Sequence, residues 1–481
     1  MYLGIDIGTS AVKAILVDDT KKIVDQASAP LTVNRPQDLW SEQDPQAWWV
    51  ATNIAVKSLK ANLRSGVKAI GLSGQMHGAT CLDESDKVLR PAILWNDGRS
   101  HAECSEMMRD LPALTRITGN LAMPGFTAPK LQWLRKEEPD IFSKTAKVLL
   151  PKDYLRLLMS GDYASDMSDS AGTLWLDVSA RDWSDEALAL TGLNRKHMPA
   201  LFEGSQGTGT LLQDIANDWG MDTVPIAGGG GDNAAGAVGS GVISSGDGFV
   251  SLGTSGVIFL ADEQYRPNVE NAVHTFCHAL PGLWHQMSVI LSAASAVDFA
   301  AKVTGFSNPA ALYEAAEQEN IPSSGALFLP YLSGERTPHN DTNARGAFFG
   351  LTHEDTATTL AQAALEGVAF ALADGVDSLR ESGASIEALS VIGGGARSHY
   401  WGKILASAFN LPLHYREGAA TGPAYGAAQL ARLCSGEESV KDVCQPPAIN
   451  LTIEPDAALR DHYHARRITF QKLYQQTKDL T

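Results

Sequence analysis

Residues 6–18, DIGTSAVKAILVD, have a second copy roughly half a chain length later in residues 251–262, SLGTSGVIFLAD. When Gly8 is aligned with Gly253, both copies read Gly-Thr-Ser, then a small residue and Val, then a mostly apolar run. The first copy begins with an acidic residue, whereas the second begins with Ser. A chain that repeats a turn together with its flanks is expected to contain two related domains.

The two apolar runs that flank the first turn predict a β-hairpin. KIVDQASAP (22–30) predicts a third strand, and a helix is expected next, with Asp44 as its N-cap and Pro45 at its first position. VKAIGLSG (67–74) predicts a buried strand. The first half of the chain therefore predicts a three-stranded antiparallel meander that leads into α/β units.

The second turn has strand-like flanks as well, and the patterns after it predict further α/β units. These are a helix over 358–380, a strand at LSVIGG (389–394) and a helix from about Gly422. We expect an α/β fold of two similar domains, residues 1–243 and residues 244–481 with a C-terminal helix, separated by a cleft. The length of 481 residues also favours two hydrophobic cores.

The composition excludes several classes of protein. The formal net charge is −17 and no block of Lys and Arg is present, so we expect no nucleic-acid partner. No apolar run is long enough to span a bilayer, and the first residues lead directly into a strand, so we expect no membrane association. The five cysteines are scattered and have no C-x-x-C spacing, which indicates a reducing, cytoplasmic compartment.

A Gly-Thr-Ser turn exposes backbone N–H groups and hydroxyls, which suit phosphate oxygens. One such turn is also an ordinary hairpin connection, but two copies with matching flanks favour two domains that face one polyphosphate. Gly8 and Thr9 would approach it from one side and Thr254 from the other. A carboxylate beside phosphate needs a cation between them, so Asp6 predicts a hydrated Mg²⁺ ion.

VPIAGGGGDNAAGAVGSG (224–241) predicts a strand, a four-glycine turn and a helix of small residues that begins at Asp232. Gly229, Gly231 and Ala234 also satisfy the G-x-G-x-x-A pattern of a dinucleotide site. That interpretation is disfavoured because Asp232 would face a pyrophosphate, the motif lies in mid-chain, and no acid follows about twenty residues later to bind a ribose. We interpret Asp232 as a general base.

The motifs GIDIGTSAVKAILVD, GGGGDNAAGA, SLGTSG and VIGGGARS, in this order, resemble the FGGY family of carbohydrate kinases. The resemblance covers essentially the whole chain and implies the actin/sugar-kinase/Hsp70-type ATPase fold, with ATP and Mg²⁺ as cofactors. GFTAPKLQWLRKE (125–137) is similar to one family signature, with Lys130 and Trp133 in place. Residues 346–366 match a second signature except at Thr359, where the family usually has a polar amide or a charged residue.

The resemblance implies roles for the candidate site residues. Asp232 would accept the proton of the attacking sugar hydroxyl, and Asn233 would help to hold the sugar. Gln75, Met76 and His77 form a Q-M-H loop that is typical of family members acting on xylulose, whereas members acting on glycerol have Arg and Glu there. The implied reaction is the ATP-dependent phosphorylation of D-xylulose to D-xylulose 5-phosphate. The sequence leaves the oligomeric state open, with a homodimer as one possible assembly.

Three further motifs are assigned less specific roles. Gly393, Gly394 and Gly395 are expected to lie against the adenosine end of ATP, because absent side chains allow flat contact. Asp97 and Arg99 are interpreted as a structural ion pair near the site rather than as catalytic groups. Residues 330–351 resemble a segment of pentulose kinases of the family, without single roles assigned.

Three alternative functions stay open. The first is a kinase for another ketopentose or a polyol, such as D-ribulose. The second is an actin- or Hsp70-like ATPase without sugar kinase activity, although only about forty residues follow the last α/β unit and leave no room for a peptide-binding domain. The third is a sugar-responsive transcription regulator, which would need a helix-turn-helix ahead of the first strand.

Overall fold

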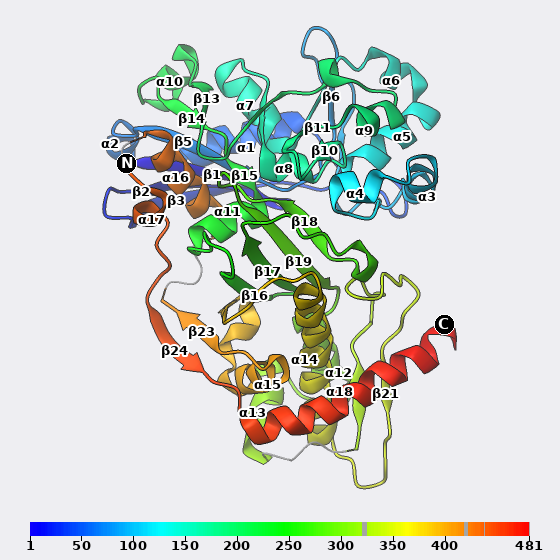
Figure 1. Cartoon of the computed structure of the whole chain (residues 1–481). Coiled ribbons are helices and arrows are strands. Elements are labelled where there is room, and N and C mark those ends of the chain that lie inside the picture. The colour runs from blue at the N-terminus through cyan, green and yellow to red at the C-terminus, as the bar shows by residue number, and fades with distance from the viewer. Residues whose placement is uncertain (320–324, 418–421, 437, 481) are drawn as a thin grey trace.

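A computed structural model describes residues 1–319, 325–417, 422–436 and 438–480. Two seven-stranded sheets are stacked along the long axis of the molecule, each with helices around it (Figure 1). The first sheet has the order β13-β14-β5-β1-β2-β3, with β15 also pairing with β5. The second sheet has the order β18-β19-β17-β16-β22-β23-β24. The predicted α/β fold of two similar halves is confirmed.

The strands of the two sheets have the following bounds. The first sheet contains β1 (Tyr2–Ile7), β2 (Ala11–Val17), β3 (Ile23–Pro30), β5 (Ala69–Gly74), β13 (Gly207–Thr210), β14 (Pro225–Ala227) and β15 (Gly230–Gly231). The second contains β16 (Gly248–Leu252), β17 (Gly256–Asp262), β18 (His274–Cys277), β19 (Trp284–Ile290), β22 (Leu389–Ile392), β23 (Leu413–Arg416) and β24 (Ile449–Ile453). Among the shorter strands is β9 (Ala164–Asp166).

The main helices include those predicted to begin at Pro45, Asp232 and about Gly422 and the one predicted over 358–380. They are α1 (Pro45–Ser58), α3 (His101–Asp110), α5 (Thr127–Glu137), α7 (Pro151–Ser160), α8 (Met167–Ala171), α10 (Gln213–Trp219), α11 (Asp232–Gly239), α12 (Ala294–Thr304), α13 (Pro309–Glu319), α14 (Ala357–Glu381), α15 (His399–Phe409), α16 (Gly422–Cys434) and α18 (Ala457–Thr477). Asp44 is the N-cap of α1, where its carboxylate accepts a hydrogen bond from the Gln46 N–H at 3.0 Å. In the described part of the chain, no helix is both long and apolar enough to cross a bilayer.

The two sheets repeat one topology. In the first, β1 is parallel to β5 and antiparallel to β2, which is antiparallel to β3. In the second, β16 is parallel to β22 and antiparallel to β17, which is antiparallel to β19. Each sheet then adds a parallel strand, β14 or β23, and an antiparallel one, β13 or β24. The repeated Gly-Thr-Ser turn therefore joins equivalent strand pairs, β1–β2 and β16–β17.

Helices α11 and α16 pack closely against each other through small residues. A side chain at Gly426 would collide with the Ala235 carbonyl oxygen, and one at Gly71 would collide with the Ala427 carbonyl oxygen. Glycine is required at both positions because backbone meets backbone there. Although α16 follows β23 in the chain, it packs on β1 and β5 of the first sheet. The segment after residue 243 is thus not confined to the second sheet.

One hydrophobic core joins the two halves beneath the cleft. It combines residues of the segment 79–198, such as Trp175, with Phe249, Phe259 and Phe276 of the second sheet. The C-terminal helix α18 packs on the second half, where Tyr463, Phe470 and Tyr474 are buried (Figure 1). These aromatic side chains of α18 therefore have a packing role.

Candidate active site between the two sheets

A cavity of about 650 Å³ lies between the two halves. The first half supplies its wall from the ends of β5 and α11 and from the loops that follow, and the second half supplies β16–β19 and the loop after β20 (Leu327–Leu329). Its polar lining includes His77, Asn96, Asp97, Asp232, Asn233, Ser251, Ser255, His274 and Arg336. Met76, His77, Asp232 and Asn233 were all predicted to bind the sugar, and the fold brings these four together.

Asp6 and Asp232 come from separate elements, β1 and the N-terminus of α11, and are close enough for their charges to interact. Burial and, to a smaller extent, the charge of Asp232 raise the pKa of Asp6 to about 7, while Ser73 opposes the shift. Burial also raises the pKa of Asp232 to about 6, against hydrogen bonds from Asn233. For Asp232, burial outweighs the effect of the helix N-terminus, which favours the charged form of a carboxylate.

Asp232 is held in place by its own neighbour and by the glycine turn. The backbone N–H and the side-chain amide of Asn233 donate to Asp232 Oδ1 at 2.8 and 3.0 Å. A side chain at Gly229 would meet the Leu72 carbonyl oxygen at 2.1 Å, and one at Gly231 would meet the Met76 sulfur at 2.9 Å. The glycines therefore let the turn approach β5 and Met76, which places Asp232 in the cavity.

His77 follows β5 and has a left-handed backbone, with φ of 70°. Its Nδ1 lies 2.6 Å from the Gly172 carbonyl oxygen. Because a carbonyl only accepts, Nδ1 carries the hydrogen and Nε2 is left as an acceptor. Burial and, to a smaller extent, the charge of Lys130 lower the pKa of His77 to about 3, so the imidazole is neutral. His77 is thus a fixed hydrogen-bond acceptor on the cavity wall.

Gln75 and Thr9 face each other behind this wall. The Thr9 hydroxyl donates to Gln75 Oε1 at 3.0 Å and accepts from Trp95 Nε1 at 3.0 Å. Gln75 Nε2 donates to Gln43 Oε1 at 2.8 Å. Gln75 is buried, and Met76 and His77 line the cavity while Gln75 does not. Gln75 therefore supports the cavity wall from behind. Since the Thr9 hydroxyl is already hydrogen-bonded, Asp6 in β1 is the group beside the first turn that is left to bind a ligand.

In the glycine-rich segment of the second half, two glycines are packed against neighbours and one faces open space. Gly393 has φ of 91°, and a side chain there would meet the Leu252 backbone at 2.8 Å. A side chain at Gly395 would meet Trp401 at 2.6 Å, whereas one at Gly394 would enter open space. Packing thus explains two of the three glycines, and only Gly394 presents an open surface. The Thr254 side chain is exposed at the β16–β17 turn.

Comparison with known proteins gives two matches to one family. Residues 1–239 match the N-terminal domain of the FGGY family of carbohydrate kinases, and residues 248–433 match its C-terminal domain. The chain belongs to this family. The predicted family, and with it the class of sugar kinase, is confirmed.

Relatives of this FGGY kinase share its full length. The xylulose kinase of Escherichia coli (strain K12) is 54% identical over 478 residues, which cover 99% of each chain. The xylulose kinase of Bacillus subtilis (strain 168) is 36% identical over 492 residues, covering 99% of this chain and 97% of the relative. The crystal structure of a xyloylose kinase from Brucella ovis superposes with a TM-score of 0.97 at 50% identity, covering 100% of both chains.

The family signature on α5 supports the cavity from behind. Lys130 is fully buried and its amino group donates to the His77 carbonyl oxygen at 2.9 Å, which holds the left-handed backbone of His77. Trp133 packs edge-on against Trp40, with ring centroids 5.4 Å apart. In the second signature, Thr359 accepts a hydrogen bond from the Thr356 N–H at 2.7 Å and completes a capping box at the start of α14. The unusual Thr359 therefore has a structural role.

Asp97 and Arg99 form the predicted ion pair, at 2.7 Å, and both side chains are almost completely buried. Arg99 also pairs with Glu42 at 2.7 Å and lies 3.6 Å from the centre of the Trp40 ring. The Arg99 guanidinium is therefore engaged with Asp97, Glu42 and the Trp40 ring. The predicted ion pair is therefore present, and its structural rather than catalytic role stays a prediction.

Sequence reasoning missed the contribution of the second half to the cavity wall. Arg336 lies within the unassigned segment 330–351, and its Nη1 is 3.1 Å from His274 Nε2. His274 Nδ1 in turn lies 2.9 Å from Asn120 Oδ1, and Phe276 stacks beside His274. The only signal in the sequence was the polar character of 330–351, because His274 comes from a strand with no motif.

Proposed function

We propose that this kinase transfers the γ-phosphoryl group of ATP to the C5 hydroxyl of D-xylulose, giving D-xylulose 5-phosphate and ADP. The observation that carries the proposal is the cavity lined by Asp232 and the fixed His77 imidazole, with Asp6 close enough to Asp232 for their charges to interact. The similarity to full-length relatives named xylulose kinases supports the choice of sugar.

The sugar would lie against the N-terminal wall of the cavity. Met76 supplies an apolar surface, and His77 Nε2 accepts a hydrogen bond from a sugar hydroxyl. Asn233 supplies a second polar group next to the base. Gln75 supports this wall through Thr9 and Gln43 rather than by direct contact.

Asp232 would take the proton of the C5 hydroxyl as that oxygen attacks the γ-phosphorus in line and the bond to ADP breaks. Its pKa of about 6 leaves it a carboxylate at neutral pH and makes it a stronger base than an ordinary aspartate. Phosphoryl transfer has a loose transition state, so positioning and electrostatic stabilisation supply most of the rate gain. Closure of the cleft would exclude water as a competing acceptor.

Asp6 is the residue that we assign to Mg²⁺. Its Oδ1 is buried and has no hydrogen-bond partner among the described residues, which fits an oxygen ligand of a cation. Mg²⁺ usually takes one or two carboxylates, several waters and substrate phosphates. When bound, it supplies charge neutralisation at the phosphates. A positive charge there would also keep Asp6 and Asp232 ionised together.

ATP would bind from the second half of the molecule. Gly394 offers the open surface for the nucleoside next to Gly393 and Gly395, and the exposed Thr254 hydroxyl would contact a phosphate. Ser251 and Ser255 line the cavity at the same turn. Gly8 closes the first turn on the Ala11 carbonyl oxygen at 3.0 Å, so this turn contributes chiefly through Asp6.

The five cysteines are free, which suits the reducing cytoplasm, where we place this kinase.

The test is a coupled assay of ADP release with D-xylulose, D-ribulose, glycerol and gluconate side by side, together with detection of the sugar phosphate. We expect the highest kcat/KM with D-xylulose. A higher kcat/KM with another acceptor would overturn the choice of sugar. ATP hydrolysis without any sugar phosphate would overturn the kinase proposal itself.

A further inference from the structure

The short helix α8 connects a contact to the residue before the base with a contact to His77. Near its start, the Ser168 hydroxyl oxygen accepts a hydrogen bond from the Gly231 N–H at 3.1 Å, and Gly231 immediately precedes Asp232. Just after its end, the Gly172 carbonyl oxygen accepts from His77 Nδ1 at 2.6 Å. One five-residue helix therefore lies between the two groups that have to meet the same substrate.

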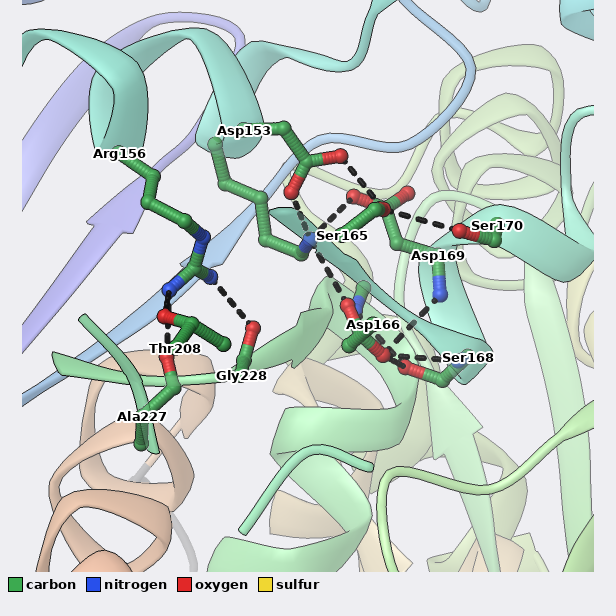
Figure 2. A network of polar contacts seen from close by, with 12 residues as sticks. Asp153, Arg156, Ser165, Asp166, Ser168, Asp169, Ser170, Thr208, Ala227 and Gly228 are labelled. Atoms are coloured by element: carbon green, nitrogen blue, oxygen red, sulfur yellow. Dashed lines mark hydrogen bonds and ion pairs between the residues drawn. The ribbon is translucent and has the colours of Figure 1, made fainter. Parts of the chain in front are cut away.

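A buried charge cluster anchors the start of this helix (Figure 2). The Ser168 hydroxyl donates to Asp166, whose carboxylate also caps α8 by accepting from the Ser168 N–H at 2.7 Å. Lys152 lies 2.8 Å from Asp166, 2.5 Å from Asp153 and 3.4 Å from Asp169, and all four side chains are completely buried. Burial disfavours the charge on Lys152, but the three carboxylates outweigh it and raise its pKa.

Helix α7, which carries Lys152, also contacts the other end of the glycine turn. Arg156, one turn after Lys152 on α7, donates from Nη1 to the Ala227 carbonyl oxygen at 2.8 Å. Its Nη2 donates to the Gly228 carbonyl oxygen at 2.6 Å (Figure 2). The turn that carries Asp232 is therefore held at 227–228 by Arg156 and at 231 by Ser168. A flexible four-glycine turn needs such restraints if its last residue is to keep one position.

We infer that Ser168 is a positioning residue for phosphoryl transfer and that α8 acts as a spacer that fixes the base Asp232 relative to His77. The inference rests on the proposed function, because it assumes that Asp232 and His77 act on one sugar. Neither Ser168 nor the Lys152 cluster lines the cavity, so their effect on the reaction passes through Gly231 and Gly172.

Ser170 provides a matched control on the same helix. It is also buried, and its hydroxyl donates to Ser165 Oγ at 2.9 Å. Ser168→Ala and Ser170→Ala therefore each delete one buried, hydrogen-bonded hydroxyl from α8. Only Ser168→Ala removes a contact to the turn that carries Asp232.

The experiment compares steady-state kinetics of both variants, normalised to the number of sugar-binding sites per chain. For Ser168→Ala we expect kcat to fall about 10- to 100-fold, because a small misplacement of the reacting groups is costly, with the KM for ATP unchanged. For Ser170→Ala we expect kcat within about twofold of the parent protein. Ser168→Cys, whose thiol is a weaker acceptor of similar size, should give an intermediate loss and replaces Ser168→Ala if that variant does not fold.

The pH profile separates positioning from general loss of structure. Asp232 shares the cavity with His77, Asp97, His274 and Arg336, and Asp6 is close enough for its charge to interact with that of Asp232. If the turn loosens in Ser168→Ala, Asp232 becomes more exposed to water, its pKa falls, and the acid limb of kcat/KM moves to lower pH. In Ser170→Ala the limb should stay in place.

Equal losses in the two alanine variants, or an unshifted acid limb in Ser168→Ala, would overturn the inference. Failure of the proposed function is a separate outcome, because the parent protein itself would then not phosphorylate D-xylulose.

Discussion

The two halves of this kinase have the same sheet topology but different chemistry at equivalent positions. Asp6 in β1 lies opposite Ser73 of the parallel strand β5, whereas Ser251 in β16 lies opposite Ile392 of the parallel strand β22. Both candidate carboxylates, Asp6 and Asp232, come from the first half. The repeated fold thus supplies a two-sided scaffold, and the departures from the repeat supply the site.

The two Gly-Thr-Ser turns show the same division on a smaller scale. The Thr9 hydroxyl is committed to Gln75 and Trp95 inside the first half. The Thr254 side chain is exposed, and its carbonyl oxygen accepts from the Ala293 N–H at 2.9 Å and from Ser295 Oγ at 2.8 Å, at the start of α12. In the same tripeptide, the Thr side chain therefore makes internal hydrogen bonds in the first half, whereas in the second half it is exposed and available to a ligand.

The largest effect is expected from Asp232→Asn, which tests whether the first half alone holds the base. The change keeps the shape of the side chain but removes its basicity, so kcat should fall about 10²–10⁴-fold. The thermal midpoint of unfolding should not fall at pH 8, because the charged form of Asp232 is disfavoured by burial. Steady-state kinetics and a thermal melt check both statements, and near-normal kcat in the folded variant would contradict the assignment.

Much of this comparison was predictable from the sequence, because its signals are local. The repeated turn, the capping residue Asp44 and the glycine run before Asp232 each have a short-range physical meaning, and the structure has the corresponding hairpins, helix and turn. The contacts of Gln75 and Arg336 were not predictable in this way. Gln75 meets Thr9 and Arg336 meets His274 only through tertiary packing, at sequence separations of 66 and 62 residues.

The next largest effect is expected from changing Asp6, whose equivalent in the second half is Ser251. Asp6→Asn should lower kcat about a hundredfold and raise the Mg²⁺ concentration needed for half-maximal activity, because charge neutralisation at the phosphates is weakened. Ser251→Asp makes the second half resemble the first. It places a further negative charge on the cavity wall, so the KM for ATP should rise about tenfold.

Titration of both variants with Mg²⁺ and ATP measures these changes. If Asp6→Asn kept the parent Mg²⁺ dependence, the metal assignment would be wrong. If Ser251→Asp left the KM for ATP unchanged, the second turn would not lie near the phosphates.

A smaller effect is expected on stability as a function of pH. The pKa values of Asp6 and Asp232, about 7 and about 6 in the folded protein, lie above the ordinary aspartate value of 3.8. The folded state therefore binds more protons than the unfolded state between about pH 4 and 7, and these two groups lower stability as the pH rises through that window. Asp6→Asn should melt a few degrees above the parent protein at pH 8, and the difference should vanish near pH 4.

Differential scanning fluorimetry from pH 4 to 8 measures this difference, with Asp18→Asn as the control. The Asp18 carboxylate is exposed and its pKa is lowered, chiefly by a hydrogen bond from Thr20. Its removal should therefore not stabilise the protein at pH 8. A pH-independent difference for Asp6→Asn would contradict the raised pKa.

The smallest effects separate the two turns directly. Thr9→Val leaves the buried Gln75 oxygen without its donor, which should cost about 1–2 kcal/mol and lower the thermal midpoint by a few degrees. Thr254→Val removes an exposed hydroxyl, so the midpoint should stay unchanged while the KM for ATP rises about two- to tenfold through the lost phosphate contact. Thermal melts and ATP titrations give a thermal midpoint and a KM for ATP for each of the two variants. The two turns differ as proposed only if Thr9→Val lowers the midpoint while Thr254→Val leaves it unchanged and raises the KM for ATP. Equal losses of stability would mean that Thr254 braces its half as Thr9 does, and an unchanged KM for ATP would remove the hydroxyl of the second turn from the nucleotide site.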